Sequence, residues 1–148
     1  MTDPAVLTVR RAFAASPERV FDAWLDPARA RRFLFATPDG DMTAVEIDAR
    51  VGGEALIVER RPAGEARHRL RYEAIEPPHR LVFLFAADPA AEGEWTRVTI
   101  EITAAGAGCV LTLTHEMDPA WAEYEARTRE GWTMILASLA DVVETDDG

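Results

Sequence analysis

Three histidines and a tyrosine in an apolar segment are the side chains of this sequence best suited to proton transfer or ligand contact. His115 precedes Glu116 near the end of a strand-like segment, and an imidazole with a pKa near 6.5 can act as a base at neutral pH. The Tyr72 hydroxyl can donate to a ligand carbonyl, although a buried tyrosine also commonly bonds to the backbone. We predict that His115 is hydrogen-bonded at the rim, and because no catalytic partner for it is identifiable, we assign no catalytic residue.

Metal ligands and cofactor motifs are not indicated. His68, His79 and His115 share no ligand-like spacing, and the single cysteine, Cys109, lies in an apolar segment typical of a small buried hydrophobe. All 16 basic residues are arginine, which excludes lysine chemistry. The sequence also has no phosphate-binding glycine loop and no nucleophile elbow. We therefore expect no metal and no cofactor.

Three acidic residues, Glu46, Asp48 and Glu59, lie on neighbouring strands of a predicted hairpin. One of them could point inward as a buried carboxylate. Charged side chains are mostly solvated, so we predict an outward orientation for most of this group and leave the individual orientations open.

Charge and length limit the classes of partner. The chain has 148 residues and a net charge of −10, which disfavours nucleic acid and anionic membrane surfaces, since both require a positive face. No run approaches the roughly 18 apolar residues of a membrane span, and the start does not resemble a secretory signal. We expect one cytoplasmic domain, residues 1–148, with a core over about 6–143.

Hydrophobic periodicity predicts one strand, two short helices, about six strands and a long final helix. Ser16, Pro17 and Glu18 form a helix start signal, and Asp26-Pro27 repeats it. The other boundaries follow from changes of period and from turn residues. The expected strands are 6–13, 45–48, 55–59, 70–72, 80–86, 95–103 and 110–115, and the expected helices begin at 17, at about 28 and at about 119.

Six consecutive strands with short turns predict an antiparallel meander, and only the final helix is long enough to cover it, which gives an α+β fold. The apolar stripe of that helix is Trp121, Tyr124, Thr128, Trp132, Ile135, Leu139 and Val142. Beside it is Gly131, which costs a helix about 1 kcal/mol relative to alanine. Either the sheet backbone approaches closely there, or a space remains between helix and sheet.

Several phrases resemble the heat-shock-protein-90 ATPase activator homologue family of the START-like, or SRPBCC (polyketide cyclase), superfamily. They are SPERVFDAWLDPARARRF, IDARVGGEALIV, YEAIEPPHRLVFLF, CVLTLTHEMDP and EGWTMILASL, in this order between Val6 and Val143. The resemblance implies a helix-grip fold, in which a curved antiparallel sheet wraps around a long C-terminal helix. It also implies a cavity between sheet and helix that holds an apolar ligand in many members.

Strand alternation then predicts the lining of such a cavity, because side chains two residues apart share a face. The assignment is ambiguous for a strand that is apolar on both faces, and a single bulge would exchange its inward and outward side chains. The predicted lining residues are Trp24, Phe33, Phe35, His68, Leu70, Tyr72, Phe83, Phe85, Leu111, Leu113, His115, Thr128, Gly131, Trp132 and Ile135.

Three functions fit these expectations. The first is binding of a small apolar or aromatic molecule, without catalysis. The second is a polyketide-cyclase-type enzyme in which Tyr72, His115 or an inward acid moves protons. The third, which we rank last, is a module that contacts a chaperone. Exposure of Val82, Leu84 or Trp95 on the outer sheet would instead favour a homodimer or partner surface.

Overall fold

The computed structural model describes residues 5–34, 40–62, 64–88, 95–117 and 125–145. The elements in chain order are β1 (Ala5–Phe13), α1 (Pro17–Leu25), α2 (Pro27–Phe33), β2 (Asp41–Ile47), β3 (Glu54–Arg61), β4 (Gly64–Glu76), β5 (Arg80–Asp88), β6 (Thr96–Ala105), β7 (Gly108–Met117) and α3 (Glu125–Thr145). The predicted order of elements is confirmed.

Both short helices begin at the predicted caps. The Ser16 hydroxyl accepts from the backbone N–H of Arg19, and the Asp26 carboxylate accepts from the N–H of Ala28. A proline occupies the first turn of each helix, where its missing N–H costs nothing. These local signals place α1 and α2 directly after β1.

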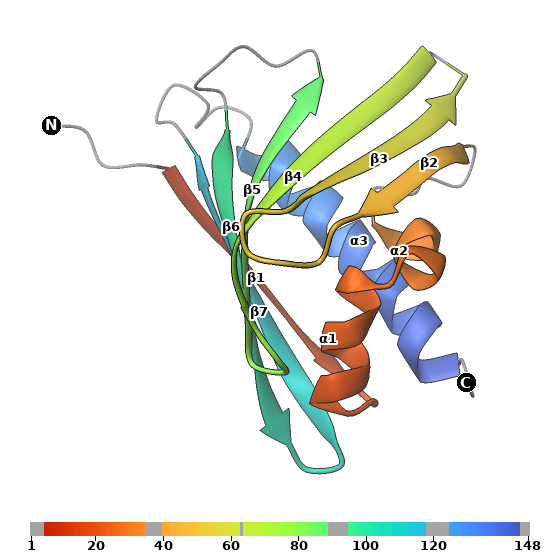
Figure 1. The fold of residues 1–148 in the computed structure, drawn as a ribbon. Coiled ribbons are helices and arrows are strands. Elements are labelled where there is room, and N and C mark those ends of the chain that lie inside the picture. Colours follow the sequence, from red (N-terminus) through yellow and green to blue (C-terminus); the bar gives the residue numbers. More distant parts are fainter. Residues whose placement is uncertain (1–4, 35–39, 63, 89–94, 118–124, 146–148) are drawn as a thin grey trace, which may run out of the picture.

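The seven strands form one antiparallel sheet in the order β1-β7-β6-β5-β4-β3-β2 (Figure 1). Strands β2 to β7 form the predicted meander, and β1 pairs with β7 along the whole of β1, from Ala5 opposite Met117 to Phe13 opposite Cys109. The edge strands are therefore β1 and β2.

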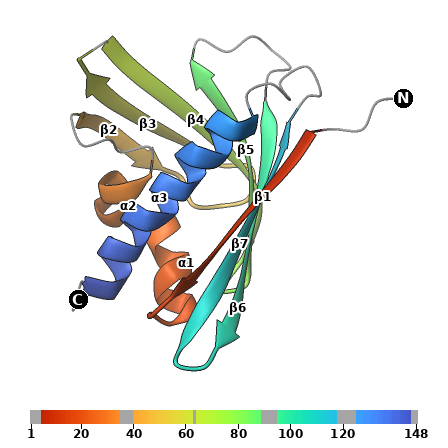
Figure 2. The same cartoon turned by 180° about the vertical axis from the view of Figure 1, so that it is seen from behind.

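Helix α3 lies across the concave side of the sheet (Figure 2). Its close backbone neighbours are β1, α2 and α1. The short helices lie beside its C-terminal half (Figures 1 and 2). This arrangement confirms the α+β, helix-grip fold.

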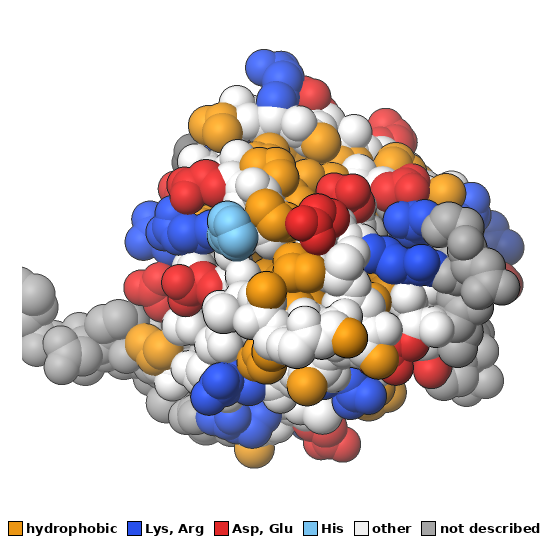
Figure 3. Space-filling view, turned by 90° about the horizontal axis from the view of Figure 1, so that it is seen from below, with side chains coloured by type: hydrophobic (Ala, Val, Ile, Leu, Met, Phe, Trp, Pro, Cys, Tyr) orange, Lys and Arg blue, Asp and Glu red, His pale blue; other side chains and the backbone are white. Residues whose placement is uncertain are grey.

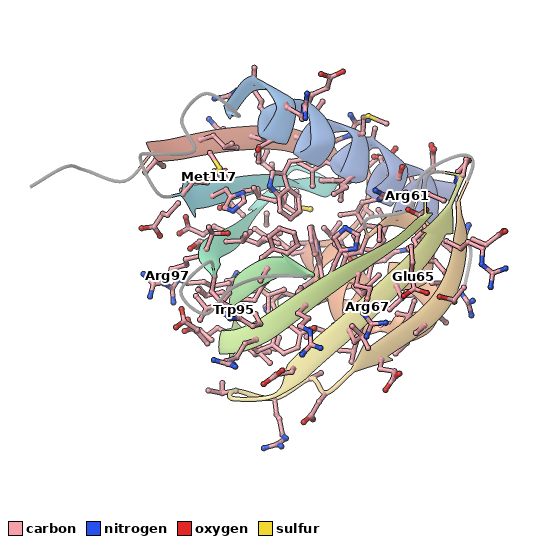
Figure 4. All side chains as sticks on the ribbon, turned by 90° about the horizontal axis from the view of Figure 1, so that it is seen from above. Arg61, Glu65, Arg67, Trp95, Arg97 and Met117 are labelled. Atoms are coloured by element: carbon pink, nitrogen blue, oxygen red, sulfur yellow. The ribbon has the colours of Figure 1, made fainter. Side chains whose placement is uncertain are left out.

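Alternation along the strands separates an inner face from an outer face. On β7, Cys109, Leu111, Leu113, His115 and Met117 are buried while the residues between them are half-buried. Figure 4 shows Met117 and Arg61 on the side of the sheet that faces α3, and Trp95 and Arg97 on the opposite side.

The outer face carries cross-strand ion pairs. Arg71 pairs with Glu54, and Arg97 pairs with Glu73 at 2.9 Å. Arg71 also lies over the ring of Trp95, 4.9 Å from its centroid. Val82 is buried and Leu84 and Trp95 are half-buried, so these three side chains do not form an exposed apolar surface.

The surface elsewhere is mixed in charge. On the face seen from below, arginine and acidic side chains are interspersed with apolar ones (Figure 3). Within the ranges that the structure describes, no helix has the length and apolar character needed to span a bilayer.

Candidate functional site

A pocket of about 170 Å³ lies between the N-terminal half of α3 and the inner face of the sheet. Strands β5 and β7 contribute one aromatic ring and one imidazole to it, and α3 contributes the remaining wall. The lining residues are Phe85, His115, Thr128, Gly131, Trp132 and Ile135, all six of them among the predicted lining residues.

Gly131 has room for a side chain. A Cβ built on it would have no atom within 4 Å outside its own helix turn and chain neighbours. The alternative that the sheet backbone approaches closely at Gly131 is therefore wrong. The missing side chain leaves open space at the pocket.

The polar groups of the pocket wall form a continuous hydrogen-bonded chain. The indole Nε1–H of Trp132 donates to His115 Nδ1 at 3.0 Å, and His115 Nε2 lies 2.7 Å from the hydroxyl of Thr96. The Thr96 hydroxyl donates to the carbonyl oxygen of Phe85 at 3.3 Å. Since an indole nitrogen can only donate, Nδ1 must accept, and the proton of neutral His115 must be on Nε2.

This series of hydrogen bonds holds His115 in its neutral form. An imidazolium has donors at both nitrogens and would lose the bond from Trp132. Burial lowers the pKa of His115 to about 4, because the charged form is desolvated. Both ring nitrogens are engaged, as predicted for a hydrogen-bonded histidine, so His115 can accept a proton only after this chain breaks.

A second aromatic group lies next to the pocket. Trp24 contacts Phe33 edge-on at a centroid distance of 5.2 Å and Phe83 at 6.4 Å, and Tyr72 contacts Phe83 at 6.4 Å. Phe83 and Phe85 both point inward from β5, so they connect this group to the pocket. We call Trp24, Phe33, Tyr72 and Phe83 the aromatic floor.

Two polar atoms of the aromatic floor have no hydrogen-bond partner. They are the Tyr72 hydroxyl and the Trp24 Nε1–H, on side chains that are 2% and 1% exposed. A buried polar group left without a partner costs about 1–3 kcal/mol. Burial, and then the negative charge of Asp48, raise the pKa of Tyr72 well above its ordinary value, which keeps the phenol protonated.

His68 lies on the other side of Phe85, with their rings stacked at a centroid distance of 6.0 Å. Its Nδ1–H donates to the carbonyl oxygen of Ile57 at 3.3 Å. Burial lowers the pKa of His68 to about 4, and the nearby Arg61 acts in the same direction. His68 is therefore a neutral, buried part of the inner face.

The sequence left the orientations of Glu46, Asp48 and Glu59 open. Of these three carboxylates, Glu59 points inward. Its side chain is 1% exposed and is paired with the guanidinium of Arg61, while Glu46 and Asp48 are exposed. A Cβ built on Gly40 would overlap the Glu59 carboxylate. Gly40 therefore leaves the space that the buried acid fills.

Other predicted lining residues belong to the packed core and do not touch the pocket. Leu70, Leu111 and Leu113 are each at most 1% exposed within the main hydrophobic cluster. Phe35, and with it Trp121 and Tyr124 of the predicted helix stripe, lie outside the described residues. In the parts of the chain that the structure describes, no three His, Cys, Asp or Glu side chains gather as metal ligands would.

A larger hollow of about 400 Å³ lies on the outer face of the sheet. Its lining is mostly charged, and Arg97 and Glu73 within it are already paired with each other. It lacks the apolar walls that bury a small ligand. The inner pocket is the better candidate site.

Sequence reasoning missed Thr96 and did not single out Glu59. Both could have been found by extending the alternation, since Thr96 shares a face with Val98 and Ile100, and Glu59 shares one with Ile57. For Glu59 alternation alone is a weak signal, because burying a carboxylate is costly without a partner.

Comparison with solved structures supports the fold. The chain is 27% identical to protein CV1439 from Chromobacterium violaceum, with a TM-score of 0.82 over 95% of this chain and 98% of that one. It is 21% identical to the AHSA1-like protein from Aeromonas hydrophila, with a TM-score of 0.81 over 95% and 93% of the two chains.

A third similar structure is DynU16, a protein in the dynemicin biosynthetic locus. It is 19% identical, with a TM-score of 0.75 over 95% of this chain and 47% of DynU16. No curated protein matches the sequence.

The sequence profile of one family matches residues 14–144, which include both short helices, the whole meander and nearly all of α3. The chain therefore belongs to the family described as activator of Hsp90 ATPase homolog 1-like protein, within the SRPBCC, or START-like, superfamily.

Proposed function

We propose that this protein binds a small apolar or aromatic molecule in the pocket beneath Gly131. The observation that carries the proposal is the pocket of about 170 Å³, whose walls are mainly the rings of Phe85, Trp132 and His115 and the side chain of Ile135. Ligand pockets are typically lined in this way, with few polar groups.

The volume limits the ligand. An apolar cavity of about 150 Å³ is sufficient for one benzene-sized molecule. The pocket is therefore matched to a single six-membered ring or a short branched chain. A larger molecule would extend out of the pocket, which is partly open to solvent beside Gly131.

The same geometry favours binding over catalysis by His115. A general base must be able to take up a proton, whereas this imidazole is held neutral by a donor at one nitrogen and an acceptor at the other. The wall is built to keep a fixed shape around a guest.

Binding can be tested by titrating the protein with n-butylbenzene and following the indole N–H resonance of Trp132 by NMR. That resonance is assigned by its loss in Trp132→Phe, and we expect it to shift on binding because Trp132 lines the pocket. Native mass spectrometry of protein purified from its own host would show whether a ligand is retained.

Ile135→Trp should fill the pocket and abolish the shift, whereas Ala137→Trp, at an exposed position of the same helix, should leave binding unchanged. A shift that survives Ile135→Trp would show that n-butylbenzene binds elsewhere, and the pocket would lose its assignment.

A further inference from the structure

The aromatic floor contains two hydrogen-bond groups that the protein itself does not use. The Tyr72 hydroxyl and the Trp24 Nε1–H are both buried without a partner, although nearly all buried polar atoms in folded proteins have one. Their rings contact the same neighbour, Phe83, each at a centroid distance of 6.4 Å. Both groups therefore belong to one region of the interior.

This region adjoins the pocket. Phe83 and Phe85 are two residues apart on the inner face of β5, which corresponds to about 7 Å along a strand. Phe85 lines the pocket, and Phe83 contacts both Tyr72 and Trp24. The two donors thus lie one inward strand position from the pocket wall, and a ligand whose ring lies beside Phe85 reaches them by displacing the side chains packed between.

The two groups also define the kind of polar atom. An indole N–H can only donate, and the Tyr72 phenol stays protonated because burial disfavours its anion. Two donors require an acceptor. The side chains around them are at most 2% exposed, and because an unpaired buried charge is costly, a neutral acceptor is favoured over an anionic one.

We infer that Tyr72 and Trp24 form the polar end of the binding site, and that the ligand is a neutral carbonyl compound whose ring lies in the pocket beneath Gly131. This inference rests on the proposed function and adds the chemical class of the ligand. The carbonyl oxygen accepts from both donors, while the ring remains among Phe85, Trp132 and Ile135.

The test compares two probes that differ only in the acceptor. 4-Phenyl-2-butanone and n-butylbenzene have the same chain length, and the carbonyl of the first replaces a methylene of the second. We expect the wild-type protein to bind the ketone about tenfold more tightly, as measured by calorimetry or NMR titration, because a well-placed buried hydrogen bond gives a difference of this size. 3-Phenylpropanoate, with the same length but a negative charge, should bind more weakly than the ketone.

The variants assign the difference to named atoms. Tyr72→Phe removes only the hydroxyl, so it should abolish most of the preference for the ketone and leave the affinity for n-butylbenzene unchanged. Trp24→Phe should also reduce the preference. Trp95→Phe is the matched control, because it removes an indole N–H on the outer face of the sheet, outside the pocket, and should not alter the ratio of the two affinities.

The stability of the ligand-free protein gives an independent measurement. If the hydroxyl has no partner, Tyr72→Phe should keep or raise the midpoint of urea unfolding. A clear decrease would mean that the hydroxyl is satisfied in the free protein, and the inference would be wrong.

The remaining outcomes separate the two proposals. Equal binding of both probes, with Ile135→Trp abolishing both, would overturn the carbonyl assignment while keeping the pocket, and the two donors would then hold only water. Failure of every probe to bind would overturn the proposed function itself. Tighter binding of the anionic probe would contradict the neutral class.

Discussion

Gly131 has no steric reason to lack a side chain. Because a methyl group placed there would meet nothing within 4 Å, we expect Gly131→Ala to raise the free energy of unfolding by about 1 kcal/mol, the difference in helix propensity. Urea unfolding would measure this. Gly52→Ala is the contrasting control, because Gly52 has a φ of 85° and alanine should lower stability there. A destabilised Gly131→Ala would show that the space around Gly131 is not free.

Individual side chains could be predicted where the pattern repeats and could not where a distant partner decides. His115 was placed correctly, since it continues the series Leu111 and Leu113 on β7. The burial of Glu59 could not be predicted from alternation alone. It depends on pairing with Arg61 and on the space left by Gly40, which directly precedes β2. The ring contacts of Tyr72 and Trp24, and the lack of a hydrogen-bond partner for their polar atoms, follow from three-dimensional packing alone.

The exposed edge of β1 is covered by side chains of α3. The Arg129 guanidinium donates to the backbone carbonyl of Thr8 at 2.6 Å, and the Glu144 carboxylate accepts from the N–H of Ala14, just beyond the end of β1, at 2.8 Å. Unpaired edge groups are templates for pairing with other chains. Side chains near the two ends of α3 thus protect this edge.

Removal of one of these contacts should weaken the edge. We expect Arg129→Ala to lower the free energy of unfolding by about 1–2 kcal/mol, since the lost hydrogen bond comes from a charged group, and to speed hydrogen exchange along β1. Arg127→Ala, at an exposed position of the same helix, is the matched control. Equal exchange in the two variants would show that Arg129 does not hold the strand.

The strands and short helices were largely predictable, because caps and alternation are local signals. Their ends were less so: β4 spans Gly64–Glu76, whereas the predicted strand covered only 70–72. On β5, where both faces are apolar, Phe83 and Phe85 were placed inward, and the structure has them inward, but Val82 on the outer face is also buried. Alternation predicts which face a side chain is on, but not how far neighbouring side chains cover that face.

The stability of the whole fold should depend on pH through two buried histidines. His68 and His115 have pKa values of about 4 in the folded protein and near 6.5 when unfolded. Between these values the unfolded chain binds protons that the folded chain does not. The contribution of these two histidines to the free energy of unfolding is therefore fully present above about pH 6.5. It decreases as the pH falls towards 4, by roughly 3 kcal/mol per histidine at most.

Urea unfolding at a series of pH values would measure this dependence. Carboxylates titrate in the same range, so the difference between the wild type and His68→Gln/His115→Gln isolates the two histidines. That difference should shrink as the pH falls from 6.5 to 4, whereas His79→Gln, at an exposed turn position, should change nothing. A constant difference would mean that neither imidazole resists protonation in the fold.

The buried residues of α3 are unevenly distributed along it. Among the side chains described for this helix, the buried ones are Trp132, Leu136, Leu139, Ala140, Val142 and Val143, and those from Ala126 to Gly131 are exposed or half-buried. The later turns are therefore held by the apolar core, whereas the described first turns are held to β1 by the Arg129 guanidinium.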